Sequence, residues 1–252
     1  MYDNKDLNIL DTVDDLESPL DQMEPVDEES EVAKPDPEEM LVLLTSSETQ
    51  QKMVAARAFC EIQDERAIPH LINLLGNVCP LMRVSAAYAL GRNPSPVAVE
   101  PLIERLEEDF NGYVRKGTVW ALGNCRDHRA LYPLIDALKY DISAVRLWAA
   151  SSLAQMAELE YEDIVASIPP LIIALRQDPM AAVRSNCGWS LGQLCREMPS
   201  NAIYAGAVDA LIEAFAEDED LSVREDAKLA LLKLGDPRSL ELIETLEMEG
   251  YV

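Results

Sequence analysis

The residues best suited to chemistry in this sequence are its cysteines and histidines, and neither set has the spacing of a known reactive site. The five cysteines are Cys60, Cys79, Cys125, Cys187 and Cys195. They include no Cys-x-x-Cys pair, so a four-ligand cluster would need thiolates from several separate parts of the chain. The two histidines, His70 and His128, lie outside any H-E-x-x-H or G-x-S-x-G motif. The sequence therefore predicts no catalytic residue and no metal site.

The cysteines and the first residues also bear on where the protein works. An odd number of cysteines without a disulfide pattern is typical of a reducing compartment. Cys79 precedes a predicted helix, and we expect it to be the most exposed thiol. The first residues, MYDNKDLNILDTVDD, lack the basic start and apolar run of a targeting peptide, and no stretch has the apolar length of a transmembrane helix. We expect a cytoplasmic protein that does not insert into a membrane.

Net charge limits the class of partner. The chain has 46 acidic and 21 basic residues, which give a formal charge of -25. Nucleic acids and anionic membranes are bound through Lys and Arg, so a surface this acidic repels them. We expect no nucleic-acid partner, and the charge favours basic or neutral protein surfaces.

Aromatic residues among small neighbours are the remaining candidates for a site. Trp120 lies in the segment G-T-V-W-A-L-G-N-C, at Gly117–Cys125. A large ring in such a segment either packs into a core or faces a ligand. The choice between these two depends on whether the segment recurs.

The segment does recur, and its repeats define the elements that carry the rings. A pattern like V-R-x-x-A-A-x-A-L-G is found at 52–60, 82–91, 114–123, 145–154, 183–192 and 223–232. A second pattern, P-L-I-x-x-L, alternates with it, and both have the period of a helix. Turns that begin at Asp64, Asp127 and Asp236 are typical of helix N-caps. Paired helices at this spacing predict an all-α fold, an α-solenoid of about six stacked antiparallel helix pairs with a C-terminal capping helix at 237–249.

The last two repeats are longer than the others. The extra residues fall near 157–166 and 197–205. They could form loops at one rim of the array, or they could extend helices.

These patterns resemble HEAT repeats, over residues 36–252. The form of the two motifs is similar to the HEAT-like repeats of cyanobacterial phycobilin lyases and of relatives associated with iron–sulfur carriers. In HEAT arrays the second helix of each pair lines the concave side, and the resemblance implies the same here. It also implies a protein partner, either an iron–sulfur carrier or a phycobiliprotein of the phycobilisome. Residues 1–35 lie outside the array and carry twelve acidic residues against Lys5 and Lys34, so we predict a disordered acidic tail.

The helical wheel separates a packing face from a candidate groove. Val114, Thr118, Val119 and Leu122 share one arc, whereas Trp120 points roughly 140° away from its middle. The repeats place other large or polar residues outside this arc. The predicted groove consists of Tyr88, Arg92, Lys116, Trp120, Asn124, Trp148, Gln155, Trp189 and Gln193. Its four aromatic rings come from neighbouring helices that lie roughly 10 Å apart. The alternative is that the rings cover the rim of the core.

Charged residues outside the groove have a structural interpretation. We expect the acids of the first helices to form a solvated convex face. Arginines such as Arg115 and Arg146 begin the second helices near acids in the preceding turns, Asp109 and Asp141. They predict an Arg–carboxylate ladder between repeats.

Two functions fit these observations. One is a non-enzymatic scaffold or adaptor that binds a partner protein along the groove without a cofactor, in iron–sulfur or photosynthetic cofactor assembly. The other is a phycobilin lyase, or a chromophore chaperone like one, that holds a bilin against the rings and transfers it to a phycobiliprotein. Only the second function would make the protein an enzyme.

Overall fold

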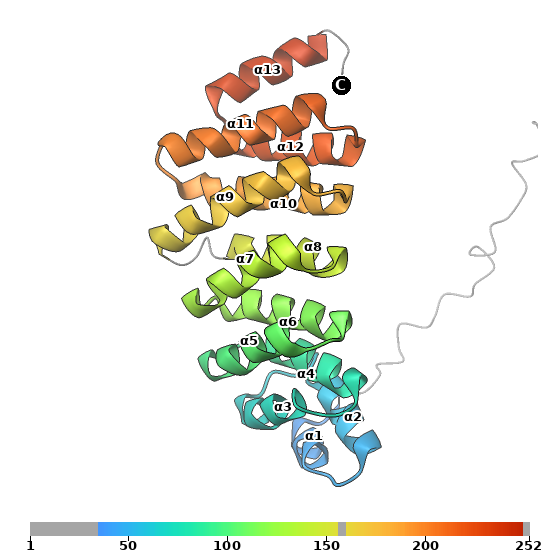
Figure 1. The fold of residues 1–252 in the computed structure, drawn as a ribbon. Helices are drawn as coiled ribbons and strands as arrows, with labels where there is room; N and C mark the ends of the chain where they lie inside the picture. The colour runs from blue at the N-terminus through green and yellow to red at the C-terminus, as the bar shows by residue number, and fades with distance from the viewer. Residues whose placement is uncertain (1–34, 156–159, 249–252) are drawn as a thin grey trace, which may run out of the picture. The chain divides into compact units, whose positions relative to one another are not determined.

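A computed structural model describes residues 35–155 and 160–248 and places thirteen α-helices in them (Figure 1). The first helices of the pairs are α1 (Pro37–Leu44), α3 (Ile68–Leu74), α5 (Val99–Glu108), α7 (Leu131–Tyr140), α9 (Tyr161–Gln177) and α11 (Ala202–Glu217). The second helices are α2 (Thr49–Ala58), α4 (Pro80–Arg92), α6 (Gly112–Cys125), α8 (Ser143–Ala154), α10 (Ala181–Leu194) and α12 (Leu221–Leu234). The last helix, α13 (Pro237–Met248), packs against α12 at the end of the stack.

The predicted architecture of six helix pairs and a capping helix is confirmed, and the described residues contain no strand. The predicted tail at 1–35 falls almost entirely outside the described residues and stays a prediction. None of the described helices combines the length and the apolar character needed to cross a bilayer.

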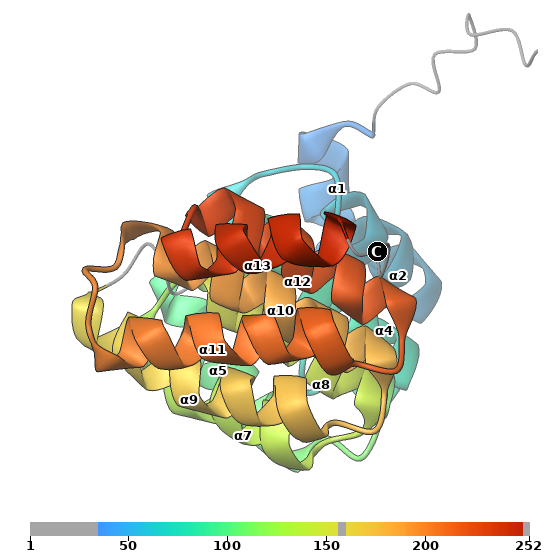
Figure 2. The same cartoon turned by 90° about the horizontal axis from the view of Figure 1, so that it is seen from above.

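The helices form two layers that differ in how closely their members pack. Seen along the stack, α7, α9 and α11 lie in one layer and α10 and α12 in the other (Figure 2). The second helices contact one another more extensively than the first helices do. Spaces of about 360 and 380 Å³ lie between α5 and α7 and between α7 and α9. The stack of described helices therefore curves toward the second helices, and we call their solvent-facing side the inner surface.

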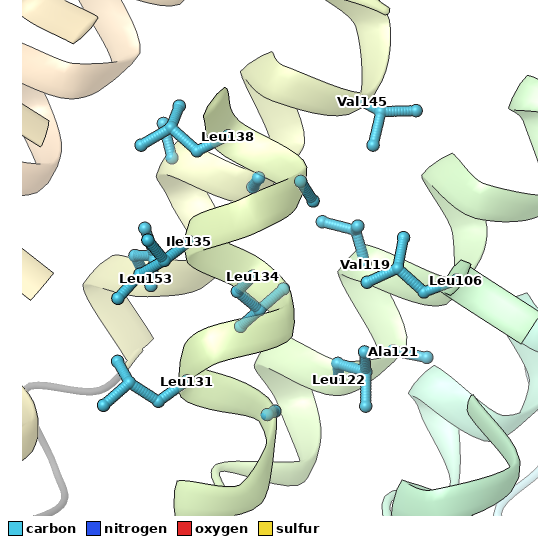
Figure 3. Packing of buried hydrophobic residues seen from close by; sticks show 14 of the residues in the cluster. Leu106, Val119, Ala121, Leu122, Leu131, Leu134, Ile135, Leu138, Val145 and Leu153 are labelled. Carbon is cyan, nitrogen blue, oxygen red and sulfur yellow. The ribbon is translucent and has the colours of Figure 1, made fainter. Parts of the chain in front are cut away.

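Small residues explain the close packing of the second helices. A Cβ atom added at Gly123 of α6 would lie 2.7 Å from the Cβ of Ser152 on α8, and one at Gly192 of α10 would lie 2.9 Å from the Cβ of Ala230 on α12. Side chains larger than hydrogen would push these helices apart. The layers are joined by leucines, of which Leu134 on α7 and Leu122 on α6 are fully buried in one continuous cluster (Figure 3).

The predicted N-caps form as expected. The carboxylate of Asp64 accepts a hydrogen bond from the Arg66 amide at 2.9 Å, and Asp127 and Asp236 accept equivalent bonds two residues on. The arginine of each turn also reaches an acid on the preceding first helix, as Arg66 reaches Glu38 at 2.8 Å. These turns therefore both start a helix and link it to the previous repeat.

The length of the last repeats comes from longer first helices. α9 begins at Tyr161 and α11 at Ala202. In both helices the repeated first-helix motif begins later, at Ile168 and at Val208. In the earlier repeats α3, α5 and α7 begin at the motif itself, after a short 3-10 turn. Of the two alternatives left by the sequence, helix extension is therefore the main one, although 156–159 lie outside the described residues.

An Arg–Asp ladder runs along the turns that join first to second helices. Its rungs are the bidentate pairs Arg83–Asp109, Arg115–Asp141, Arg146–Asp178 and Arg184–Asp218, with N–O distances of 2.6 to 2.9 Å. Each guanidinium also donates to a carbonyl in its own repeat, as Arg115 does to Asp109 at 2.8 Å. The predicted ladder is confirmed, with one correction. The carboxylate partners of Arg115 and Arg146 are Asp141 and Asp178 of the following turns. The acids of the preceding turns, Asp109 and Asp141, contribute their backbone carbonyls to Arg115 and Arg146.

Burial and hydrogen bonding shift the pKa values of three ladder carboxylates in opposite directions. Burial raises the pKa of Asp109, Asp178 and Asp218, but hydrogen bonds from the ladder arginines and from nearby backbone N–H groups outweigh it, so each pKa is lowered. The carboxylates therefore stay ionised and paired at neutral pH.

Removing one ladder arginine should destabilise the stack. Arg184 and Asp218 are both nearly buried, so Arg184→Gln leaves a buried carboxylate without its charged partner. We expect a loss of about 3 kcal/mol in the free energy of unfolding, measured by urea denaturation followed by circular dichroism. Arg176→Gln is the control, because Arg176 and Glu213 form a half-exposed pair whose loss should cost under about 1 kcal/mol. Equal effects of the two variants would contradict this role of the ladder.

The ladder also predicts an acid limit of stability. Because the folded-state pKa values of Asp109, Asp178 and Asp218 are lowered, their contribution is fully present above the unfolded-state value of about 3.9. It is lost as the pH falls below that value through the folded-state values. We expect the thermal unfolding midpoint to drop steeply below about pH 4. A midpoint that stays constant through this range would contradict the account.

Candidate binding surface on the second helices

The predicted groove residues lie on second helices, or at the end of one in the case of Gln155, and they differ in exposure. Tyr88, Trp120 and Trp189 each follow a ladder arginine by five residues, whereas Trp148 follows Arg146 by two. Tyr88, Trp120 and Trp148 are partly buried, and the Trp189 side chain is exposed, at 43% of its full area. The four rings are therefore all at least partly accessible to solvent.

Tyr88 and Trp120 form a pair, which the sequence did not predict. Their ring centroids are 5.5 Å apart and their planes are tilted by 42°. The two helices are expected to lie roughly 10 Å apart, and the rings come closer together than that because of Gly91. A Cβ at Gly91 would lie 2.4 Å from Cζ3 of Trp120, so the indole lies across α4 in the space that a side chain would fill.

An apolar pocket lies beside this pair. It has a volume of about 270 Å³ and is lined by Cys60, Val84, Ser85, Tyr88, Arg92 and Trp120. Cys60, Val84 and Ser85 were not predicted. Val84 and Ser85 follow the ladder residue Arg83 by one and two positions, the places that Lys116 and Trp148 hold in later repeats. A comparison of all repeats at the two positions after the ladder arginine could have identified Val84 and Ser85 as residues of the site.

Two of the predicted polar groove residues join the helices together. Arg92 donates its Nε–H to the carbonyl of Cys60 at 3.1 Å, and Asn124 donates to the carbonyl of Gly91 at 3.0 Å. Arg92 remains exposed, so its other N–H groups still face solvent. Asn124 acts mainly as a link between α6 and α4.

Lys116 and Trp148 form a cation–π pair between α6 and α8. The Lys116 ammonium lies 5.3 Å from the centroid of the Trp148 ring, within the range of a cation–π contact. Trp148 also packs against the hydrophobic core, so the alternative of a ring at the core rim holds for part of its surface. Gln155, the C-cap of α8, and Gln193, on α10, are both partly buried.

The cysteines are placed as small apolar residues. Cys187 and Cys195 are buried, and Cys60 and Cys125 are partly buried. Burial raises the pKa of Cys60 and Cys125, and it raises the pKa of Cys195 to about 12. Cys79 is partly buried against the core, as Cys60 and Cys125 are, so its place as the most exposed thiol stays a prediction. Within the described part of the chain, no three His, Cys, Asp or Glu side chains gather as metal ligands.

A substitution at Gly91 should test the placement of Trp120. In Gly91→Ala the new methyl would overlap the indole and also lie 3.1 Å from the Ala121 backbone. We expect a shifted tryptophan fluorescence spectrum and a loss of about 1 to 3 kcal/mol in the free energy of unfolding. Gly206→Ala on α11 is the matched control, because nothing lies within 4 Å of its Cβ. That change should stabilise the protein by about 0.5 to 1 kcal/mol, and an unchanged spectrum in both variants would contradict the contact.

Comparison with known families agrees with this architecture. Three stretches, 38–116, 99–166 and 168–247, match the family of HEAT repeats, and the first two overlap. They cover most of the chain, and the protein belongs to the HEAT-repeat family. No curated protein matches the sequence.

Solved structures with the same fold include designed and natural proteins. An engineered protein is 25% identical with a TM-score of 0.60, over 79% of this chain and 98% of that one. A designed armadillo repeat protein in complex with the peptide (KR)4 is 21% identical with a TM-score of 0.61, over 78% of this chain and 98% of that one. The complex of CpcE and CpcF of phycocyanin lyase from Nostoc sp. PCC7120 is 29% identical with a TM-score of 0.54. That match covers 66% of this chain and 99% of the other.

Proposed function

We propose that this protein is a non-enzymatic scaffold that binds a partner protein along its inner surface. The observation that carries the proposal is the group of rings on the second helices, where Trp120 and Tyr88 flank an apolar pocket. Rigid aromatic side chains at the edge of a pocket are the usual anchors of protein interfaces. The HEAT-repeat fold supports the same function, because such arrays present extended curved surfaces for binding.

The size of the pocket favours an anchoring side chain over a whole chromophore. Its volume of about 270 Å³ lies just below the range of about 300 to 1,000 Å³ that small-molecule sites occupy. A partner's apolar side chain would fill it, and the surface beyond, from Lys116 to Trp189, would contact the rest of the partner.

The identity of the partner rests on resemblance. The sequence motifs favour a protein of iron–sulfur or photosynthetic cofactor assembly, namely an iron–sulfur carrier or a phycobiliprotein. The similarity to the CpcE and CpcF complex of phycocyanin lyase favours the phycobiliprotein among these. It also supports a second candidate function, in which this chain holds a bilin as a lyase or a chromophore chaperone.

One experiment separates the two functions. The purified chain is mixed with phycocyanobilin and its visible absorbance is recorded, and the immobilised chain is tested for binding of purified apo-phycobiliprotein and of an iron–sulfur carrier. The scaffold proposal predicts an unshifted bilin spectrum and retention of one protein. A shifted band with no retained protein would favour the lyase.

The rings should determine the affinity of the retained protein. We expect Trp120→Ala to weaken binding by roughly tenfold or more, as loss of an aromatic anchor does at other interfaces. Tyr132→Ala is the matched control, because Tyr132 is 70% exposed on the first helix α7 and lies away from the inner surface. Circular dichroism checks that both variants keep their helices. Unchanged binding by the Trp120 variant would place the interface elsewhere.

A further inference from the structure

Acidic residues are absent from five consecutive second helices. α2, α4, α6, α8 and α10 contain no Asp or Glu, although 46 of the 252 residues of the chain are acidic. The first helices α1, α5, α7, α9 and α11 each carry at least one acid. The acid-free run ends at α12, with Glu225 and Asp226. These five second helices therefore contribute no acidic side chain to the inner surface, although Glu61 follows α2 closely and Asp226 of α12 accepts a hydrogen bond from Ser185 of α10.

Four acids in the turns beside these helices are paired with ladder arginines. Asp109, Asp141, Asp178 and Asp218 lie in the turns beside the second helices, and each carboxylate accepts two hydrogen bonds from a ladder arginine. A bidentate pair of opposite charges has little net field beyond its immediate surroundings. The ladder therefore does not restore negative charge to the inner surface.

Basic residues lie on the same surface, beside the apolar pocket. Arg92 lines the pocket with Trp120 and is exposed. Arg57 on α2 is also exposed. Burial and the neighbouring Glu61 raise the pKa of the Cys60 thiol in the pocket wall, and the charges of Arg92 and Arg57 oppose this shift with a smaller effect. Lys116 lies on α6, over Trp148. Arg92 therefore lines the mostly apolar pocket itself, whereas Arg57 and Lys116 lie on the helices to either side of α4.

Distance and screening decide whether the net charge of -25 overrides this local pattern. Packed helices lie about 8 to 10 Å apart, so the acids on the outer side of the first helices are more than one helix layer from the inner surface. The Debye length at physiological ionic strength is about 8 Å. The outer acids are therefore largely screened at the inner surface, and the nearby cations dominate.

We propose that the inner surface between α2 and α10 binds an acidic polypeptide segment, with one bulky apolar residue in the pocket beside Trp120. Its carboxylates would lie against Arg57, Arg92 and Lys116. This inference rests on the proposed function and specifies the chemistry of the partner at the same surface. It also differs from the basic or neutral partner that the net charge of the chain favoured.

Fluorescence anisotropy with labelled peptides tests the inference at physiological ionic strength. The probe is Glu-Glu-Leu-Glu-Glu-Phe-Glu-Glu, and its matched forms carry Gln or Lys at every Glu position. We expect the Glu peptide to bind the full chain roughly tenfold more tightly than the Gln peptide, which is the ratio expected for one or two charge-assisted contacts. The double variant Arg92→Gln/Lys116→Gln should remove most of this difference, and Tyr132→Ala should not change it.

The outcomes separate the two proposals. If the Gln or Lys peptide binds as tightly as the Glu peptide and Trp120→Ala weakens all of them, the surface is confirmed and the acidic preference is overturned. If no peptide depends on Trp120, the proposed function fails together with the inference. If phycocyanobilin, which carries carboxylates, binds in an Arg92- and Lys116-dependent way while the Glu peptide does not, the claim of a polypeptide partner is overturned.

Discussion

The bidentate bond between an arginine at the start of one second helix and an aspartate in the next turn sets the register of the whole stack. Each ladder aspartate accepts from one arginine through its carboxylate, and the next arginine donates to a backbone carbonyl of the same turn, as Arg115 does to Asp109. A shift of one repeat relative to its neighbour would leave these partly buried charges unpaired, which is costly. The ladder therefore fixes the register of α4, α6, α8 and α10, the four helices that carry the rings.

Close packing of the second helices has the same origin and a direct consequence for function. Since glycines and serines such as Gly123 and Ser152 occupy the contacts between them, large side chains of these helices lie either toward the first helices, as the buried Leu122 does, or toward solvent, as the exposed Trp189 does. The acids of the helix pairs lie on first helices, in turns and on α12, and none lies on α2, α4, α6, α8 or α10.

Much of this could be predicted from the sequence because the repeat is visible in it. The recurring Arg and the Asp-x-Arg turns, such as Asp64 to Arg66, gave the helix pairs, the caps and the existence of a ladder. The contact of Trp120 with Tyr88 could not be predicted, since it depends on how far α6 approaches Gly91 of α4. The same limit applies to Asn124, whose carbonyl partner belongs to another repeat.

The central proposal is that a partner protein binds the inner surface. The three tryptophans of the chain all lie on second helices. Labelling the protein with 5-fluorotryptophan gives one ¹⁹F NMR resonance for each of them. Titration with a retained partner protein should shift the Trp120 resonance, assigned from Trp120→Phe, and at least one of the other two. A saturated complex in which all three resonances stay unchanged would contradict the account.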